Sequence, residues 1–133
     1  VATINGQKHK LQPPRGGYLV VYAWSTWSPA GLGDSPSDMN DLYAKFHGRG
    51  LDVVGISTDY RKQDLLEYLE KNGIAWPQVL NGPDLSTGIA ADLGIAKSPM
   101  AILVDPAGRI VSIGQSANEI WSLLDARLPE GKR

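Results

Sequence analysis

Few residues in this 133-residue chain could do chemistry by themselves, and the most suggestive lie between Trp24 and Pro36. Ser28 stands there before Pro29, where an apolar run gives way to helical spacing. A serine acts as a nucleophile only with a general base within hydrogen-bond reach, because a hydroxyl is a very weak acid. The two histidines, His9 and His47, belong to other segments, so we expect Ser28 to be a helix N-cap rather than a nucleophile.

Composition and spacing exclude several other kinds of chemistry. The chain has no cysteine, so it cannot by itself exchange thiols and disulfides, a reaction that requires a thiolate nucleophile. Two isolated histidines without cysteine do not make a metal-ligand pattern, and the spacing of Gly31 and Gly33 is not that of a phosphate-binding loop. The sequence therefore predicts no metal site and no cofactor.

Charge and length limit the possible partners. The net charge is -1 and the lysines and arginines are scattered, which argues against a nucleic-acid surface. No run of about 20 apolar residues is present, so we expect no membrane insertion by this domain. We expect a single domain over 1–133, with 1–17 as an N-terminal hairpin and loop, 18–128 as the core and 129–133 as a tail. Because the chain begins with valine, we also expect it to be part of a longer protein.

Hydrophobic spacing predicts the elements that position the stretch around Ser28. Apolar runs over 18–24, 51–57 and 100–104 are typical of buried strands, and a turn pairs the last of them with 109–114. The remaining predictions are a hairpin over 2–11, an irregular connection over 74–80, a helix from Ser28 that Pro36 either kinks or restarts with Ser35 as a second cap, a helix over 61–71 capped by Asp59, a helix over 85–93 capped by Asp84, and a helix over 118–128.

The central stretch resembles a known active-site segment. Residues 24–31 read Trp-Ser-Thr-Trp-Ser-Pro-Ala-Gly and precede Asp34-Ser35-Pro36. This resembles the active-site segment of the TlpA/ResA-like thiol-disulfide oxidoreductases, a thioredoxin-fold family related to the redoxins and AhpC/TSA proteins. The family pattern reads Trp-Ala-Thr-Trp-Cys-Pro-Pro-Cys, so Ser28 and Gly31 stand at the two cysteine positions. Further segments resemble the family at 53–59, 94–105 and 108–111.

The resemblance and the order of elements predict the same fold. A strand-helix-strand crossover gives a parallel pair, and the closing hairpin adds antiparallel strands, so the sheet is mixed. We expect an α/β protein with the thioredoxin-like three-layer sandwich, that is, a mixed central sheet with helices on both faces and an N-terminal β-hairpin.

The family's catalytic positions are vestigial in this chain. Ser28 and Gly31 replace the cysteines, and Asp34 stands where the family has an acid near its active site. Without a thiol to serve, Asp34 is interpreted as a first-turn acid that favours the helix dipole. We therefore assign no catalytic residue.

Without the cysteines, the residues that match the family's active site could still bind a peptide in a groove. The resemblance implies a cis bond between Ser98 and Pro99, and in thioredoxin folds the residue before this proline pairs through its backbone with an extended peptide. Trp24 is expected either to line this groove or to lie in the core, and Trp27 either to line it or to be an exposed relic, with Trp76 nearby. The candidate peptide-binding residues are Trp27, Ser28, Pro29, Ala30, Ser98 and Pro99.

Two functions follow from these observations. The first is a redox-inactive thioredoxin-like domain that acts as a binding or structural module for proteins or extended peptides. The alternative is a thiol-disulfide oxidoreductase whose thiols are supplied elsewhere or have been removed from this chain. By analogy with the family, we expect a location in the bacterial periplasm, in the cell envelope or outside the cell.

Overall fold

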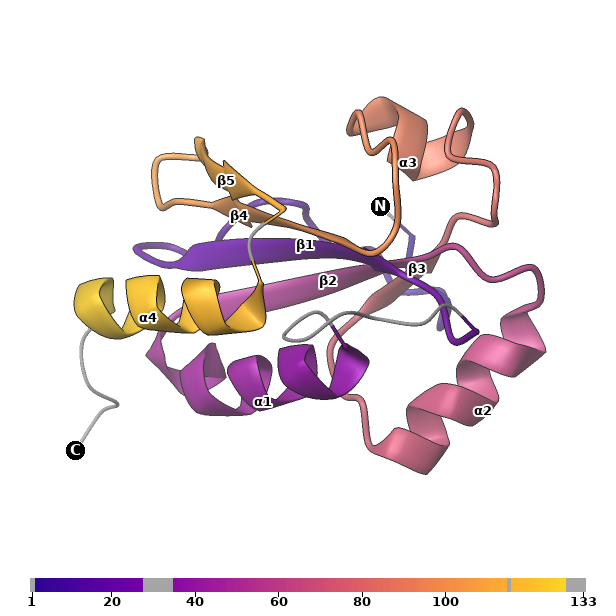
Figure 1. Cartoon of the computed structure of the whole chain (residues 1–133), viewed down its shortest axis with the longest axis horizontal. Helices are drawn as coiled ribbons and strands as arrows, with labels where there is room; N and C mark the ends of the chain where they lie inside the picture. The colour runs from indigo at the N-terminus through magenta and orange to yellow at the C-terminus, as the bar shows by residue number, and fades with distance from the viewer. Residues whose placement is uncertain (1, 28–34, 115, 129–133) are drawn as a thin grey trace.

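A five-stranded sheet forms the centre of the structure, a computed structural model that describes residues 2–27, 35–114 and 116–128. The strand order is β3-β2-β1-β4-β5. Strands β1, β2 and β3 are parallel to one another, β4 runs antiparallel to β1, and β5 runs antiparallel to β4. The predicted mixed sheet is therefore confirmed (Figure 1). The strands are β1 (Tyr18–Trp24), β2 (Leu51–Ser57), β3 (Gln78–Leu80), β4 (Met100–Val104) and β5 (Ile110–Ile113).

Two of the helices begin at a serine whose side chain binds a free backbone amide. Ser35 and Ser116 each form a capping box. The serine hydroxyl accepts a hydrogen bond from the backbone amide three residues later, and the acidic side chain of that later residue accepts one from the backbone amide of the serine. Ser35 was one of two predicted caps for the first helix, and the other, Ser28, lies outside the described residues. The helices are α1 (Pro36–Phe46) with a 3-10 turn η1 (His47–Arg49), α2 (Lys62–Asn72), α3 (Gly88–Asp92) and α4 (Ala117–Arg127).

The core lies on both faces of the central strand. All seven residues of β1 are buried, so its side chains alternate between two apolar layers. One layer joins Val20 and Trp24 to side chains of α1, α2 and α4, and the other joins Val21 to Ala90 of α3. Helices thus cover both faces of the sheet, as Figure 1 shows. No helix in the described part of the chain is both long and apolar enough to cross a membrane.

The connections differ from the predicted ones more than the strands do. Residues 2–8 form a turn closed by a single bridge between Ala2 and Lys8 instead of a two-stranded hairpin, and the Ile4 amide donates to Gln78 at 2.9 Å. Residues 78–80, predicted as irregular, form β3 beside β2. The prediction that Asp84 caps a helix is wrong, because its carboxylate closes a tight turn with Ser86, and α3 begins only at Gly88.

The predicted cap of α2 is also wrong. The residue at the N-cap is Arg61, whose side chain pairs with Asp64 in the first turn and caps none of the free backbone amides. Asp59, the expected cap, is buried and directs its carboxylate to the end of β1 instead.

Candidate functional site

Four connections meet at one edge of the sheet. The parallel strands β1, β2 and β3 all have their carboxyl ends there, and β4 begins there because it runs antiparallel to β1. In open α/β sheets this edge is where ligands usually bind. The segments that meet there are 25–27, 58–61, 81–87 and 98–99.

A pocket of about 290 Å³ lies among these connections. Its walls include two aromatic side chains that are largely exposed, Trp27 at 64% and Tyr60 at 78%. We call it the Trp27–Tyr60 pocket, and it is lined by Trp27, Thr58, Tyr60, Pro83, Leu85 and Ser98. None of these side chains carries a charge, so the pocket suits an uncharged ligand group that packs against aromatic rings.

Ser98 brings unpaired polar groups to this pocket. Its hydroxyl oxygen is buried and has no hydrogen-bond partner. Among the described residues, no backbone hydrogen bond involves Ser98, because the pairing of β4 with β1 starts only at Met100. The peptide bond from Ser98 to Pro99 is cis, the geometry expected from the sequence. Within the described residues, the backbone of Ser98 thus pairs with no other backbone group.

Asp59, whose carboxylate is buried, connects two of the segments that line the pocket. The residue is 1% exposed. Its Oδ1 accepts from the Thr26 amide at 3.0 Å and from the Thr26 hydroxyl at 2.7 Å, while its Oδ2 accepts from the Ser57 hydroxyl at 2.7 Å. None of the ion pairs found within the described ranges involves Asp59. Hydrogen bonds from neutral donors therefore stabilise this carboxylate in place of a cation.

Neighbouring hydrogen bonds extend this link between β1 and β2. The Thr58 amide and hydroxyl both donate to the carbonyl of Trp24, at 2.8 and 3.2 Å. The regular ladder ends at the pair of Trp24 and Ser57. Thr58 and Asp59 thus hold the two chain segments together beyond the last strand pair.

The loop that carries Pro83 and Leu85 is organised by Asn81. The Asn81 amide donates to the Ser57 carbonyl at 2.8 Å, and its side-chain oxygen accepts from the Ala90 amide in α3 at 2.9 Å. Within the loop, the Ser86 hydroxyl and amide both donate to Asp84 and hold the pKa of that carboxyl below its usual range. These hydrogen bonds therefore fix the backbone of the loop where Pro83 and Leu85 line the pocket.

Trp24 and Trp27, three residues apart, have opposite environments. Trp24 is 1% exposed, stacks on Tyr22 and donates its indole N–H to Gln78 at 3.0 Å. Trp76 packs beside it and is also buried. The interpretation of Trp24 as a core residue is therefore confirmed, and neither Trp24 nor Trp76 lines the pocket. Trp27 alone of the three reaches the surface there.

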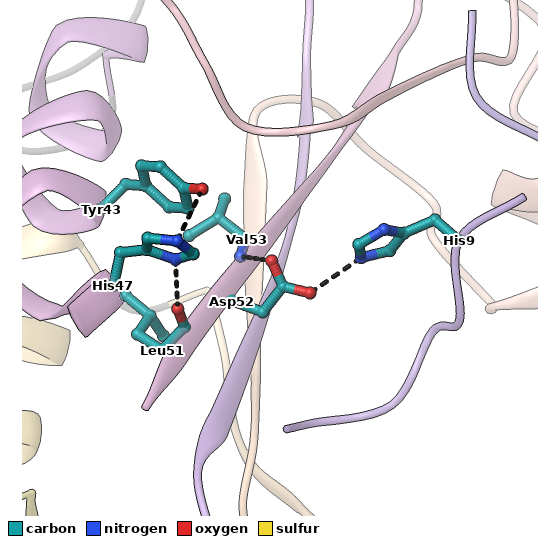
Figure 2. A network of polar contacts seen from close by, with 6 residues as sticks. All are labelled: His9, Tyr43, His47, Leu51, Asp52 and Val53. Carbon is teal, nitrogen blue, oxygen red and sulfur yellow. Dashed lines mark hydrogen bonds and ion pairs between the residues drawn. The ribbon is translucent and has the colours of Figure 1, made fainter. Parts of the chain in front are cut away.

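Both histidines lie at the opposite end of β2 (Figure 2). His9 donates to Asp52 at 2.8 Å, and Asp52 also accepts from the Val53 amide. His47 contacts the Leu51 carbonyl at 3.3 Å. Neither histidine reaches the carboxyl edge, so neither can act as a base there. Within the described residues, no group of three or more His, Asp or Glu could hold a metal ion.

The structure brings only part of the predicted site together. Trp27 and Ser98 line one pocket, as proposed from the sequence, and Pro99 follows directly in the chain. Sequence reasoning missed Thr58, Tyr60, Pro83 and Leu85, and the one available signal was that 58–60 follow a buried strand at the same edge. The other predicted residues, Ser28, Pro29, Ala30, Gly31 and Asp34, lie outside the described residues.

Comparisons with known proteins agree with this architecture. The model of a family described as thioredoxin-like matches residues 16–110. The thiol-disulfide oxidoreductase ResA of Geobacillus thermodenitrificans is 23% identical over 113 residues, which cover 85% of this chain and 63% of the relative. ResA of Oceanobacillus iheyensis is 26% identical over 81% of this chain and 54% of its own length. The chain thus spans less than two thirds of these relatives.

Solved structures show the same fold. The thioredoxin domain of a thiol-disulfide oxidoreductase from Bacteroides vulgatus has a TM-score of 0.73 and 25% identity, over 96% of this chain and 91% of that chain. A thiol:disulfide interchange protein from Chlorobium tepidum has a TM-score of 0.74 and 21% identity, over 96% and 90% of the two chains. The resemblance to ResA-like oxidoreductases is thereby confirmed, and the chain belongs to the thioredoxin-like family.

Proposed function

We propose that residues 1–133 form one redox-inactive thioredoxin-like domain that binds extended peptides in the Trp27–Tyr60 pocket. The observation that carries this proposal is an exposed aromatic pair beside Ser98, whose backbone groups have no partner among the described residues. An extended peptide would pair with the Ser98 backbone by strand addition and place a side chain between the two rings. A chain without cysteine offers no thiol for exchange with such a peptide.

Two features of the pocket support a peptide over a compact polar ligand. The lining has no charged side chain and no cluster of donors aimed at one point. Large aromatic surfaces contribute contact area at little cost in conformational entropy, as in other peptide sites. Phe, Tyr, Pro or Leu side chains in an otherwise extended peptide are therefore the expected contacts.

Alanine substitution of the two aromatic residues tests the proposal. A peptide selected from a random library on the wild-type domain is measured by titration calorimetry against Trp27→Ala and Tyr60→Ala. Each substitution is expected to weaken binding at least about tenfold, because aromatic residues dominate such contacts. Ser98→Ala should keep the affinity, because strand addition uses the backbone.

A matched control separates the pocket from general surface stickiness. Ile110 on the edge strand β5 is 59% exposed and lies outside the pocket lining, so Ile110→Ala should bind as the wild type does. Failure of the library to yield any binder, or equal binding by Trp27→Ala and Tyr60→Ala, would contradict the proposal.

The alternative is a thiol-disulfide oxidoreductase whose thiols come from another part of its protein. The observation in its favour is that the relatives named above are thiol-disulfide oxidoreductases. A disulfide-reduction assay on the whole natural protein decides between the two, because this chain alone has no thiol under either proposal. We expect no activity above background. Measurable reduction would overturn the redox-inactive proposal. By the same family analogy, we further propose a location in the bacterial cell envelope or periplasm, or outside the cell.

A further inference from the structure

We infer that Asp59 is the positioning residue of the Trp27–Tyr60 pocket. Its carboxylate ties the segment that carries Trp27 to the end of β2 and so fixes where the two aromatic walls stand. This inference rests on the proposed function for what the pocket binds, but the tie itself is a property of the free protein.

The position of Asp59 in the chain links three of the six lining residues. It is flanked by Thr58 and Tyr60, which both line the pocket. Its hydrogen-bond partner Thr26 directly precedes Trp27, which forms the opposite wall. The Asp59 carboxylate thus connects the two backbone segments that carry the aromatic side chains. Asp59 and its partner Thr26 are 33 residues apart in sequence.

The geometry of the Thr26 contact restricts the backbone as well as the side chain. One oxygen, Oδ1, accepts both the amide N–H and the hydroxyl of Thr26. Holding both groups on one acceptor limits the φ and χ1 angles of Thr26, and Trp27 therefore leaves the loop in a restricted direction. Hydrogen bonds to a charged, buried acceptor are the stronger kind.

Other roles for this carboxylate do not fit the structure. Asp59 does not cap α2, whose N-cap is Arg61. It takes part in none of the ion pairs found among the described residues. Its second oxygen is bound by Ser57, which also accepts from the Asp59 amide at 3.1 Å. Ser57 orients the carboxylate so that its other oxygen, Oδ1, accepts both hydrogen bonds from Thr26.

Preorganisation is the consequence for binding. A wall held in place before the ligand arrives does not have to be ordered during binding, which improves affinity without a new contact. Asp59 itself does not line the pocket, so its substitution should act on affinity only through Trp27 and Tyr60.

The test combines a readout on the free protein with peptide affinity. Amide hydrogen exchange at Thr26 and the Trp27 indole signal are followed by NMR in Asp59→Ala, Asp59→Asn and Thr26→Val, with Asp52→Asn as the matched control. In Asp59→Ala the Thr26 amide should exchange about tenfold faster or more, the Trp27 indole signal should shift, and peptide affinity should fall several-fold. Thr26→Val should shift the indole signal less, because the amide bond is kept.

The conservative variant separates positioning from mere stability. Asp59→Asn keeps an oxygen acceptor for Thr26, so it should restore most of the slow exchange and most of the affinity that Asp59→Ala loses. Asp52→Asn should change neither readout. If Asp59→Ala is unfolded, Thr26→Val decides the question through the Trp27 indole signal, which should shift relative to the wild type because the hydroxyl bond to Asp59 is lost.

The outcomes distinguish this inference from the proposed function. Unchanged Thr26 exchange and an unchanged Trp27 signal in every folded Asp59 and Thr26 variant would overturn the positioning role, whatever the peptide data show. A wild-type domain that binds no peptide would overturn the proposed function, while faster Thr26 exchange in Asp59→Ala would still support the tie.

Discussion

At the amino end of β2, Asp52 is partly exposed and pairs with His9, whereas beyond the carboxyl end Asp59 is buried and bound by neutral donors. The first contact fastens the N-terminal segment to the sheet, and the second fastens the loop that carries Trp27. Polar partners can thus stabilise an acid at the surface or in the interior, but only the buried one is costly to disturb. The pocket lies at the end with the buried acid.

The largest change in the free energy of unfolding is expected from a substitution at the carboxyl end of β2. Asp59→Ala removes the acceptor of the Thr26 amide, the Thr26 hydroxyl and the Ser57 hydroxyl. Leaving buried donors unsatisfied is expected to lower the free energy of unfolding by about 2–4 kcal/mol. Urea denaturation measures this change, and a loss below that of Asp52→Ala would show that the ranking of the two ends is wrong.

A smaller effect is expected at the amino end. Asp52→Ala or His9→Ala removes a partly exposed pair, so each should lower the free energy of unfolding by no more than about 1 kcal/mol. The double substitution should cost less than the sum of the two single losses, because both single substitutions remove the contact that the two side chains share. The same urea denaturation series measures all three variants, and additive losses would mean that the two side chains stabilise the fold through separate contacts.

The smallest effect concerns Tyr43, which lies near Asp52 and contacts His47 at 3.4 Å (Figure 2). Partial burial and then the charge of Asp52 raise the pKa of Tyr43 above its usual value. The native state therefore holds this proton more tightly than the unfolded state does. This contribution to stability is complete below the ordinary tyrosine pKa of about 10 and is lost as the pH rises through the folded pKa.

Comparing wild type with Tyr43→Phe in urea at pH 9 and at pH 11 tests this sign. The wild type should lose more stability between the two pH values than the variant does. Asp52→Asn should reduce the difference, because it removes one of the two causes. An equal loss in wild type and Tyr43→Phe would show that ionisation of Tyr43 does not affect the stability of the fold.

The strands could be predicted from sequence because their signal is local. The apolar run over 18–24 is β1 to the residue, since a central strand buried on both faces leaves no polar interruption. The pattern over 51–57 likewise gives β2. Residues 78–80 were missed because a three-residue strand at an edge carries too little pattern to distinguish it from a loop.

The site was predictable only in part because its contacts are not local. An aspartate that lies between the end of a strand and the start of a helix is typical of a cap, and nothing near Asp59 in sequence reveals a partner 33 residues away. Trp24 and Trp27 belong to one motif, and only the packing against Gln78 and Tyr22 separates the core residue from the exposed one. Pro83 and Leu85 join the pocket through a loop organised by Asn81.

The most direct test of the central claim is an NMR titration of the ¹⁵N-labelled chain with a selected peptide. The account predicts saturable shifts centred on Trp27, Thr58, Tyr60 and Ser98, with little change at His9 and Asp52. Shifts centred on another surface, or on the amino end of β2, would contradict the assignment of the Trp27–Tyr60 pocket as the binding site.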